Sequence, residues 1–228
     1  MDILYEDNHI IIVNKTSSEI VQGDKTGDEP LSERIQKYLK EKYNKPGNVF
    51  IGVVHRLDRP VSGLVVFAKT SKALARLNEM FRTHTNLQKK YWAIVKNAPK
   101  EPEAQLTNFL VRKEKLNKTF VYDQEVEGSK KSTLSYKVIG KTDNYFLLEV
   151  ELMTGRHHQI RSQLAHIGCP IKGDLKYGFP RSNKNGGISL HARSVTFTHP
   201  VTKEVITVTA PVPKDDVLWK TFEETAID

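Results

Sequence analysis

The sequence predicts an α+β protein in which a mixed, mostly antiparallel sheet is flanked by helices. Eight runs have the length and the β-branched or aromatic content of strands, whereas three segments repeat apolar residues at helical spacing. Several of these runs also follow one another with no helix between them, which a doubly wound parallel sheet does not allow.

The predicted strands are short apolar runs separated by turn-forming residues. In chain order they are Ile10–Val13, Val49–Val54, Leu64–Ala68, Tyr91–Val95, Leu134–Ile139, Phe146–Val150, Ile188–Phe197 and Val205–Val208. The polar segments 96–103, 112–118 and 181–187 are expected to be exposed loops.

Each predicted helix has one apolar stripe and a recognisable end. The first follows Pro30, which suits the first turn of a helix. The second begins at Ser71, a good N-cap residue. The third runs from about Arg156 to Ile167 and ends at Gly168. The stripes are Leu31, Ile35, Tyr38 and Leu39, then Leu74, Leu77 and Phe81, then Ile160, Leu164 and Ile167.

The chain has 228 residues, of which 38% are hydrophobic, which is enough for one well-packed domain over residues 1–228. No internal repeat or low-complexity segment marks a boundary. Lys and Arg number 35 against 27 for Asp and Glu, which gives a formal charge of +8. This excess favours a polyanionic partner such as RNA or DNA.

The single cysteine, Cys169, excludes an internal disulfide framework and a cysteine-rich zinc site. The apolar run Ile10–Val13 is too short for a signal segment or a membrane span. We therefore expect an unprocessed cytoplasmic protein with no membrane association. Nothing in the sequence indicates an obligate protein partner, so a monomer is expected.

The first segment with chemical potential runs from His55 to Leu64 and places Asp58 in a loop between two strands, where catalytic groups concentrate. Arg56 and Arg59 would hold the Asp58 carboxylate in its charged form, as a nucleophile requires. A salt-bridged structural aspartate in a turn is the alternative, because structural ion pairs perturb carboxylates as well.

The second segment, Leu152–Arg161, crosses from a strand into the third predicted helix. His157 and Arg161 are four residues apart and would share a helix face. Arg161 could then reach a site near the start of the helix, while Ile160 and Leu164 hold the helix on the core. The alternative is an ordinary solvated helix face.

These segments together resemble the RluA family of pseudouridine synthases. The resemblance covers nearly the whole chain and rests mainly on three ordered blocks. They are His55-Arg56-Leu57-Asp58 with Ser62-Gly63-Leu64, then Gly155-Arg156 through His158-Gln159-Ile160-Arg161, then Pro170-Ile171 with Gly173-Asp174 and Tyr177-Gly178. Tyr5-Glu6-Asp7, Asn14-Lys15, Lys90-Tyr91, Leu190-His191-Ala192 and Phe197 with His199-Pro200 add to it.

The resemblance implies a pseudouridine synthase fold with an RNA-binding cleft, and it implies roles for single residues. Asp58 is the expected catalytic aspartate, Arg161 pairs with its carboxylate, and Tyr91 lies against the base and helps to remove the proton from carbon 5. Arg56 occupies the space that the flipped nucleotide leaves. The expected RNA-binding residues are Arg56, His55, Arg156 and Gln159.

Other positions are expected to be structural or to differ from the family. His55 also supports its loop, and Gly173-Asp174 with Tyr177 form a turn near the site. Thr16, Val61 and His157 stand where proline, threonine and threonine are usual, which affects loop geometry and target choice. Because the resemblance to the family already begins at Ile3, we expect the short form of the family without an N-terminal RNA-binding domain.

The implied reaction isomerises uridine to pseudouridine, and no atoms enter or leave. It needs no metal or other cofactor, and the sequence shows neither a phosphate-binding glycine loop nor a metal-ligand cluster. The target base must leave its stack, which costs least in loops, so structured loops of ribosomal or transfer RNA are the expected substrates.

Two other functions remain alternatives at this point. One is a metal-dependent nuclease, and the other is an RNA-binding or chaperone module that has kept a synthase scaffold. The nuclease ligands would be His55 and Asp58 with His157, His158 or His166.

Overall fold

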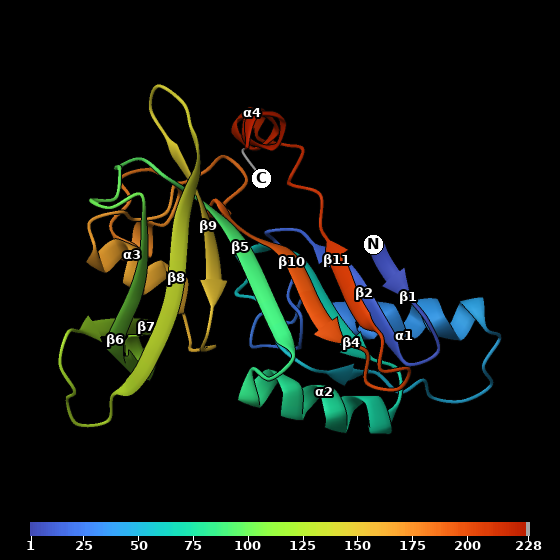
Figure 1. Ribbon diagram of the computed structural model, residues 1–228. Helices are drawn as coiled ribbons and strands as arrows, with labels where there is room; N and C mark the ends of the chain where they lie inside the picture. The colour runs from blue at the N-terminus through green and yellow to red at the C-terminus, as the bar shows by residue number, and fades with distance from the viewer. Residues whose placement is uncertain (227–228) are drawn as a thin grey trace. The chain divides into compact units, whose positions relative to one another are not determined.

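The computed structural model describes residues 1–226, which form an α+β structure in two compact units (Figure 1). The chain passes from the first unit to the second and returns. Residues 1–88 and 192–211 make the first unit, and residues 89–191 with the segment from Val212 onward make the second. The α+β class with a mostly antiparallel sheet is as predicted.

The sheet of the first unit is built around two apolar strands, β2 (Ile10–Lys15) and β4 (Ser62–Ala68), which pair antiparallel. Their apolar residues from Ile10 to Val13 and from Val65 to Ala68 are fully buried, which explains the strong strand signal in the sequence. The remaining strands flank this pair: β1 (Asp2–Glu6) on β2, β3 (Gly52–Val53) on β4, β10 (Leu190–Thr198) on β4, and β11 (Val205–Thr209) on β10.

Two amphipathic helices belong to the first unit, and both predicted starts shift by one residue. Pro30 is the N-cap of α1 (Leu31–Lys42) rather than a first-turn residue. Thr70 is the N-cap of α2 (Ser71–Thr83), because its hydroxyl accepts the N–H of Ala73 at 3.2 Å. This bond satisfies a first-turn donor that Ser71, as the first helical residue, cannot reach.

The second unit is an antiparallel sheet in the order β5 (Leu87–Val95), β9 (Phe146–Leu152), β8 (Lys130–Lys141), β6 (Glu103–Lys113) and β7 (Lys118–Tyr122). Its other elements are α3 (Gln159–His166), α4 (Val217–Thr225) and two short 3₁₀ turns, η1 (Glu114–Leu116) and η2 (Leu175–Tyr177). One of its apolar clusters joins Trp92 of β5 to Trp219 and Phe222 of α4.

The sequence prediction missed β1, β6, β7 and α4 and extended one strand too far. Strand β6 mixes charged, polar and apolar residues, and its one apolar run, Phe109-Leu110-Val111, is shorter than any of the predicted strands. The segment 112–118, predicted as a loop, is the hairpin from β6 through η1 to β7. Only Gly52 and Val53 of the predicted strand Val49–Val54 pair with β4.

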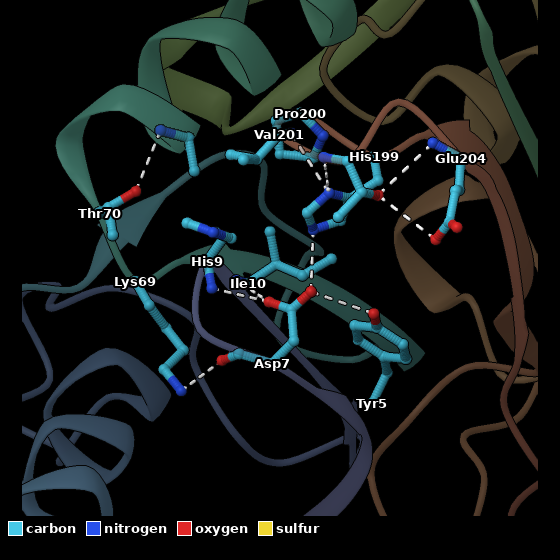
Figure 2. Close-up of polar contacts among 12 residues, drawn as sticks. Tyr5, Asp7, His9, Ile10, Lys69, Thr70, His199, Pro200, Val201 and Glu204 are labelled. Carbon is cyan, nitrogen blue, oxygen red and sulfur yellow. Dashed lines mark hydrogen bonds and ion pairs between the residues drawn. The ribbon is translucent and has the colours of Figure 1, made fainter.

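Two motif segments from distant parts of the sequence meet inside the first unit (Figure 2). The Nδ1 atom of buried His199 accepts the N–H groups of Val201 and Thr202, so the ring hydrogen resides on Nε2. Nε2 lies 2.9 Å from Oδ2 of Asp7, whose other oxygen accepts the N–H groups of His9 and Ile10. The β1–β2 turn and the β10–β11 turn are thereby tied together.

Residue 63, in the block Ser62-Gly63-Leu64, must be glycine because the backbone of Ala192 passes too close to leave room for a side chain. Its φ is +115°, and an added Cβ would lie 2.4 Å from both N and O of Ala192. Gly27, with φ +77°, has open space around it and serves as the control for backbone strain alone. We expect Gly63→Ala to destabilise the protein by about 2 to 4 kcal/mol and Gly27→Ala by about 1 kcal/mol. Far-UV circular dichroism during denaturation measures both, and equal costs would contradict the steric argument.

Candidate active site

The loop that carries Asp58, residues 54–61, is anchored to the first unit by two apolar residues. Leu57 and Val61 are buried, whereas Arg56 is exposed and Asp58 is half-buried. The N–H of Val61 donates to the carbonyl oxygen of Asp58 at 3.0 Å, which closes a turn. The loop lies between β3 and β4, as predicted.

His55, at the start of this loop, is held by the protein itself. Its Nε2 accepts the N–H of Val66 at 3.0 Å, and its ring stacks on Phe81 with a centroid separation of 4.7 Å. One face and one nitrogen of the imidazole are therefore used to fix the loop against β4 and α2.

Lys15, at the end of β2, is hydrogen-bonded to the backbone of this loop. It was not identified from the sequence as a functional residue. Its side chain is almost fully buried, and Nζ donates to the carbonyl oxygens of Thr16 at 2.8 Å and Arg59 at 3.0 Å. Burial lowers the pKa of Lys15 to about 7, although the charges of Glu19 and Asp58 act in the opposite direction. A lysine two residues after the apolar run Ile10–Val13 was the available signal.

The depressed pKa of Lys15 predicts a pH-dependent contribution to stability. Between pH 7 and the unfolded value of 10.5, the unfolded state holds a proton that the folded state has released. The free energy of unfolding of the natural protein should therefore rise with pH in this window relative to Lys15→Met, by at most about 1.4 kcal/mol per pH unit. Denaturant titrations of both proteins at pH 6, 7.5 and 9 check this, and a constant difference would contradict it.

Arg59, which follows Asp58, points to an exposed acidic loop. Its Nη1 donates to Asp28 at 2.7 Å, and its Nη2 contacts Asp24 at 3.3 Å and the hydroxyl of Thr26 at 2.7 Å. We expected Arg59 to hold Asp58 in its charged form. The structure directs its guanidinium to these side chains instead.

In the second unit, α3 begins three residues later than predicted. His158 is its N-cap, with a left-handed backbone conformation (φ 52°) that a continuous helix from Arg156 cannot contain. His157 therefore precedes the helix, and the expected helix face shared by His157 and Arg161 does not exist. Gly168, with φ +79°, ends the helix region as predicted.

Gln159 organises the turn before α3. Its Oε1 accepts the N–H of Arg156 at 3.0 Å and the hydroxyl of Thr154 at 2.8 Å, and its Nε2 donates to the carbonyl oxygen of Thr133 at 3.1 Å. The Gln159 side chain is buried, whereas that of Arg156 is exposed.

Arg161 forms a buried bidentate ion pair with Asp174. Nε lies 2.7 Å from Oδ2 and Nη2 lies 2.9 Å from Oδ1, and the two side chains are 6% and 1% exposed. The guanidinium also lies over the ring of Tyr177, 5.2 Å from its centroid. The turn that carries Gly173-Asp174 and Tyr177 thus holds Arg161 directly.

A hydrogen-bonded chain next to this pair fixes the protonation of His158. The Tyr177 hydroxyl accepts the N–H of Thr119 at 2.8 Å and donates to Nδ1 of His158 at 2.9 Å. Burial, with the neighbouring Arg161 charge, lowers the pKa of His158 to about 2. His158 is therefore neutral at physiological pH and serves as a structural acceptor.

Tyr91 lies in β5 opposite Val150 of β9 and is 8% exposed. Successive strand residues face opposite sides, and its neighbour Trp92 faces the cluster with Trp219. Because neighbouring side chains of a strand face opposite sides, the sequence required only one of Tyr91 and Trp92 to be buried. The structure buries both, which places the Tyr91 ring on the face opposite that cluster.

Residues 1–226 contain no group of three or more His, Cys, Asp or Glu side chains placed to hold a metal ion. None of the helices in this range is long and apolar enough to cross a membrane.

The solved structures that match this chain define its fold class. The human protein "RNA Pseudouridylate Synthase Domain Containing 4" aligns with a TM-score of 0.81 over 96% of this chain and 92% of its own, at 22% identity. The human "RNA Pseudouridylate Synthase Domain Containing 1" aligns with a TM-score of 0.69 over 100% of this chain and 96% of its own, at 21% identity. The fold is that of the pseudouridylate synthases.

Sequence comparison identifies the family. Residues 9–166 match the family model described as RNA pseudouridylate synthase. The chain is 34% identical to "Uncharacterized RNA pseudouridine synthase slr1629" of Synechocystis, over 93% of this chain and 66% of the relative's length. It is 30% identical to "tRNA pseudouridine synthase C" of Vibrio parahaemolyticus, over 97% of this chain and 94% of the relative. The chain belongs to the RNA pseudouridylate synthase family.

Proposed function

We propose that this protein isomerises uridine to pseudouridine in ribosomal or transfer RNA, with Asp58 as the nucleophile. The observation that carries the proposal is the family match over residues 9–166, which includes Asp58 on a loop anchored by Leu57 and Val61. The names of two relatives support both substrate classes. One is "Ribosomal large subunit pseudouridine synthase C" of Buchnera aphidicola, 31% identical, and another is the transfer RNA enzyme of Vibrio parahaemolyticus.

The proposed catalytic set is Asp58, Tyr91 and Arg161. Desolvation by bound RNA would raise the pKa of the Asp58 carboxyl, and the guanidinium of Arg161 would oppose that rise by pairing with it. The ion pair with Asp174 supports this role, because it restricts the orientation of a side chain that must meet Asp58 in one geometry. Tyr91 would stack on the base, with its hydroxyl near the proton on carbon 5.

The exposed arginines are the proposed direct contacts to RNA. Arg56 would fill the space left by the flipped nucleotide and Arg156 would meet a phosphate, since both side chains face solvent. His55 and Gln159, which we also expected to bind RNA, use their polar atoms within the protein. We propose that these two act by shaping the loops that bear Arg56 and Arg156.

The reaction breaks the bond between nitrogen 1 of the base and the ribose, turns the base, and rejoins it through carbon 5. The Asp58 carboxylate either attacks carbon 1′ of the ribose or removes a ribose proton to give a glycal, and both routes need it ionised. Exclusion of water prevents hydrolysis of the separated sugar. No proposed step uses a metal or cofactor.

Release of tritium from carbon 5 of uridine tests the proposed function, because that hydrogen is lost when the base rejoins. Ribosomal and transfer RNA transcribed with tritium at this position should release it to water when incubated with the purified protein. Pseudouridine mapping of the same RNA, and of cellular RNA with and without the gene, locates the site. Absence of release and of new pseudouridine on both RNA classes would contradict the proposal.

We further propose that the two units act together as one catalytic domain over residues 1–228, as a monomer in the cytoplasm. The family match supports the single catalytic domain, because it begins in the first unit and ends in the second.

A further inference from the structure

The exposed loop Gln22–Glu29 is attached to the catalytic segment through Arg59. Every residue of this loop is exposed, and it carries three acidic side chains and one lysine. Its base is closed by two backbone bonds, from the N–H groups of Leu31 and Ser32 to the carbonyl oxygens of Ile20 and Val21. Its tip contacts the side chain of Arg59.

The guanidinium of Arg59 is hydrogen-bonded to three side-chain oxygen atoms of this loop. Asp28 accepts from Nη1, while Asp24 and the hydroxyl of Thr26 accept from Nη2. Thr26 in turn donates to Asp24, which fixes the geometry of the tip. Anionic oxygens at one guanidinium, here one each from Asp24 and Asp28, are also what a phosphodiester group offers, since the guanidinium fork matches both carboxylate and phosphate geometry.

Arg59 also lies next to Asp58, where the proposed function places the RNA. Consecutive Cα atoms are about 3.8 Å apart, so RNA that reaches Asp58, as the proposed function requires, also comes close to Arg59. The Arg59 side chain is 36% exposed, and those of Asp24 and Asp28 are 41% and 59% exposed. Ion pairs as exposed as these are weak and readily exchanged for another anion.

We propose that Arg59 is a phosphate-binding residue and that the carboxylates of Asp24 and Asp28 occupy its guanidinium until an RNA phosphate displaces them. This inference rests on the proposed function, which puts RNA at Asp58. The acidic loop then lowers the affinity for any RNA that cannot place a phosphate at Arg59, and so favours RNA that can.

Equilibrium binding to a fluorescein-labelled RNA hairpin with an oligouridine loop tests the inference. Asp24→Asn/Asp28→Asn should bind about two- to tenfold more tightly than the natural protein. Arg59→Gln should bind more weakly, and its plot of log Kd against log salt concentration should have a slope smaller by about 0.7 to 0.9, the contribution of one phosphate contact.

A matched variant separates this mechanism from general electrostatics. Glu33→Gln/Glu41→Gln removes two exposed acidic charges from α1 in the same unit and should tighten binding less. Adding Arg59→Gln to Asp24→Asn/Asp28→Asn should reduce the gain to that of the α1 variant, because the two sites are coupled through one guanidinium. Equal tightening by both acidic pairs, or a gain that without Arg59 still exceeds that of the α1 variant, would overturn the inference.

Binding and turnover distinguish the inference from the proposed function. The Arg59 series is read from binding, whereas the proposed function is read from tritium release. A natural protein that binds the hairpin with the predicted pattern but forms no pseudouridine would leave the Arg59 assignment standing and contradict the enzyme proposal. If the natural protein does not bind the hairpin, the Arg59 assignment is wrong.

Discussion

Replacing Asp58 with asparagine should reduce pseudouridine formation to below about a hundredth of the natural rate while RNA binding is retained. Asparagine keeps the size of the side chain and one acceptor oxygen but cannot act as a nucleophile, and loss of a nucleophile usually costs far more than a hundredfold. Because Asp58 is half-buried on a loop held by Leu57, Val61 and Lys15, the substitution should leave the fold intact. Tritium release under single-turnover conditions measures the rate.

The control for this prediction is binding of the same hairpin RNA by both proteins. If both proteins bind the RNA with the same dissociation constant but the variant has lost turnover, Asp58 acts in the chemical step. Turnover above a hundredth of the natural rate would mean that another group is the nucleophile. Equal loss of binding and turnover would assign Asp58 to RNA recognition instead.

The second large effect is expected at the buried pair of Arg161 and Asp174. Removal of one partner leaves an uncompensated buried charge, so Arg161→Met should destabilise the protein by about 3 to 5 kcal/mol. Replacement of both partners by apolar residues, as in Arg161→Met/Asp174→Leu, should recover most of that loss. The two tryptophans, Trp92 and Trp219, lie in the same unit as the pair, so tryptophan fluorescence during denaturation reports its stability.

The double variant separates the structural role of Arg161 from its proposed catalytic role. If Arg161 pairs with Asp58 during the reaction, the double variant is stable but inactive. Tritium release near the natural rate by a stable double variant would show that Arg161 only maintains the fold. Arg161→Met stability equal to that of the natural protein would contradict the assignment of a structural ion pair.

The sequence predicted elements where the local signal and the tertiary environment coincide. The apolar runs at Ile10–Val13 and Leu64–Ala68 became the buried strands β2 and β4, because a strand covered on both faces is apolar along its length. The loop position of Asp58 followed from its place between such runs. Strand β6 lacked a strong local pattern and forms through pairing with β8, whereas helix α4 has an apolar face with Trp219 and Phe222 that the prediction missed.

The sequence by itself determined the α+β class, the family resemblance and the loop that carries Asp58, because these depend on residue type and order. The tertiary structure decided which charges meet. It paired Arg161 with Asp174, 13 residues away, directed Arg59 to Asp24 and Asp28 more than 30 residues earlier, and bonded Lys15 to the loop that carries Asp58. The physical reason is that an ion pair needs atoms within about 4 Å, and separation along the chain does not report that distance.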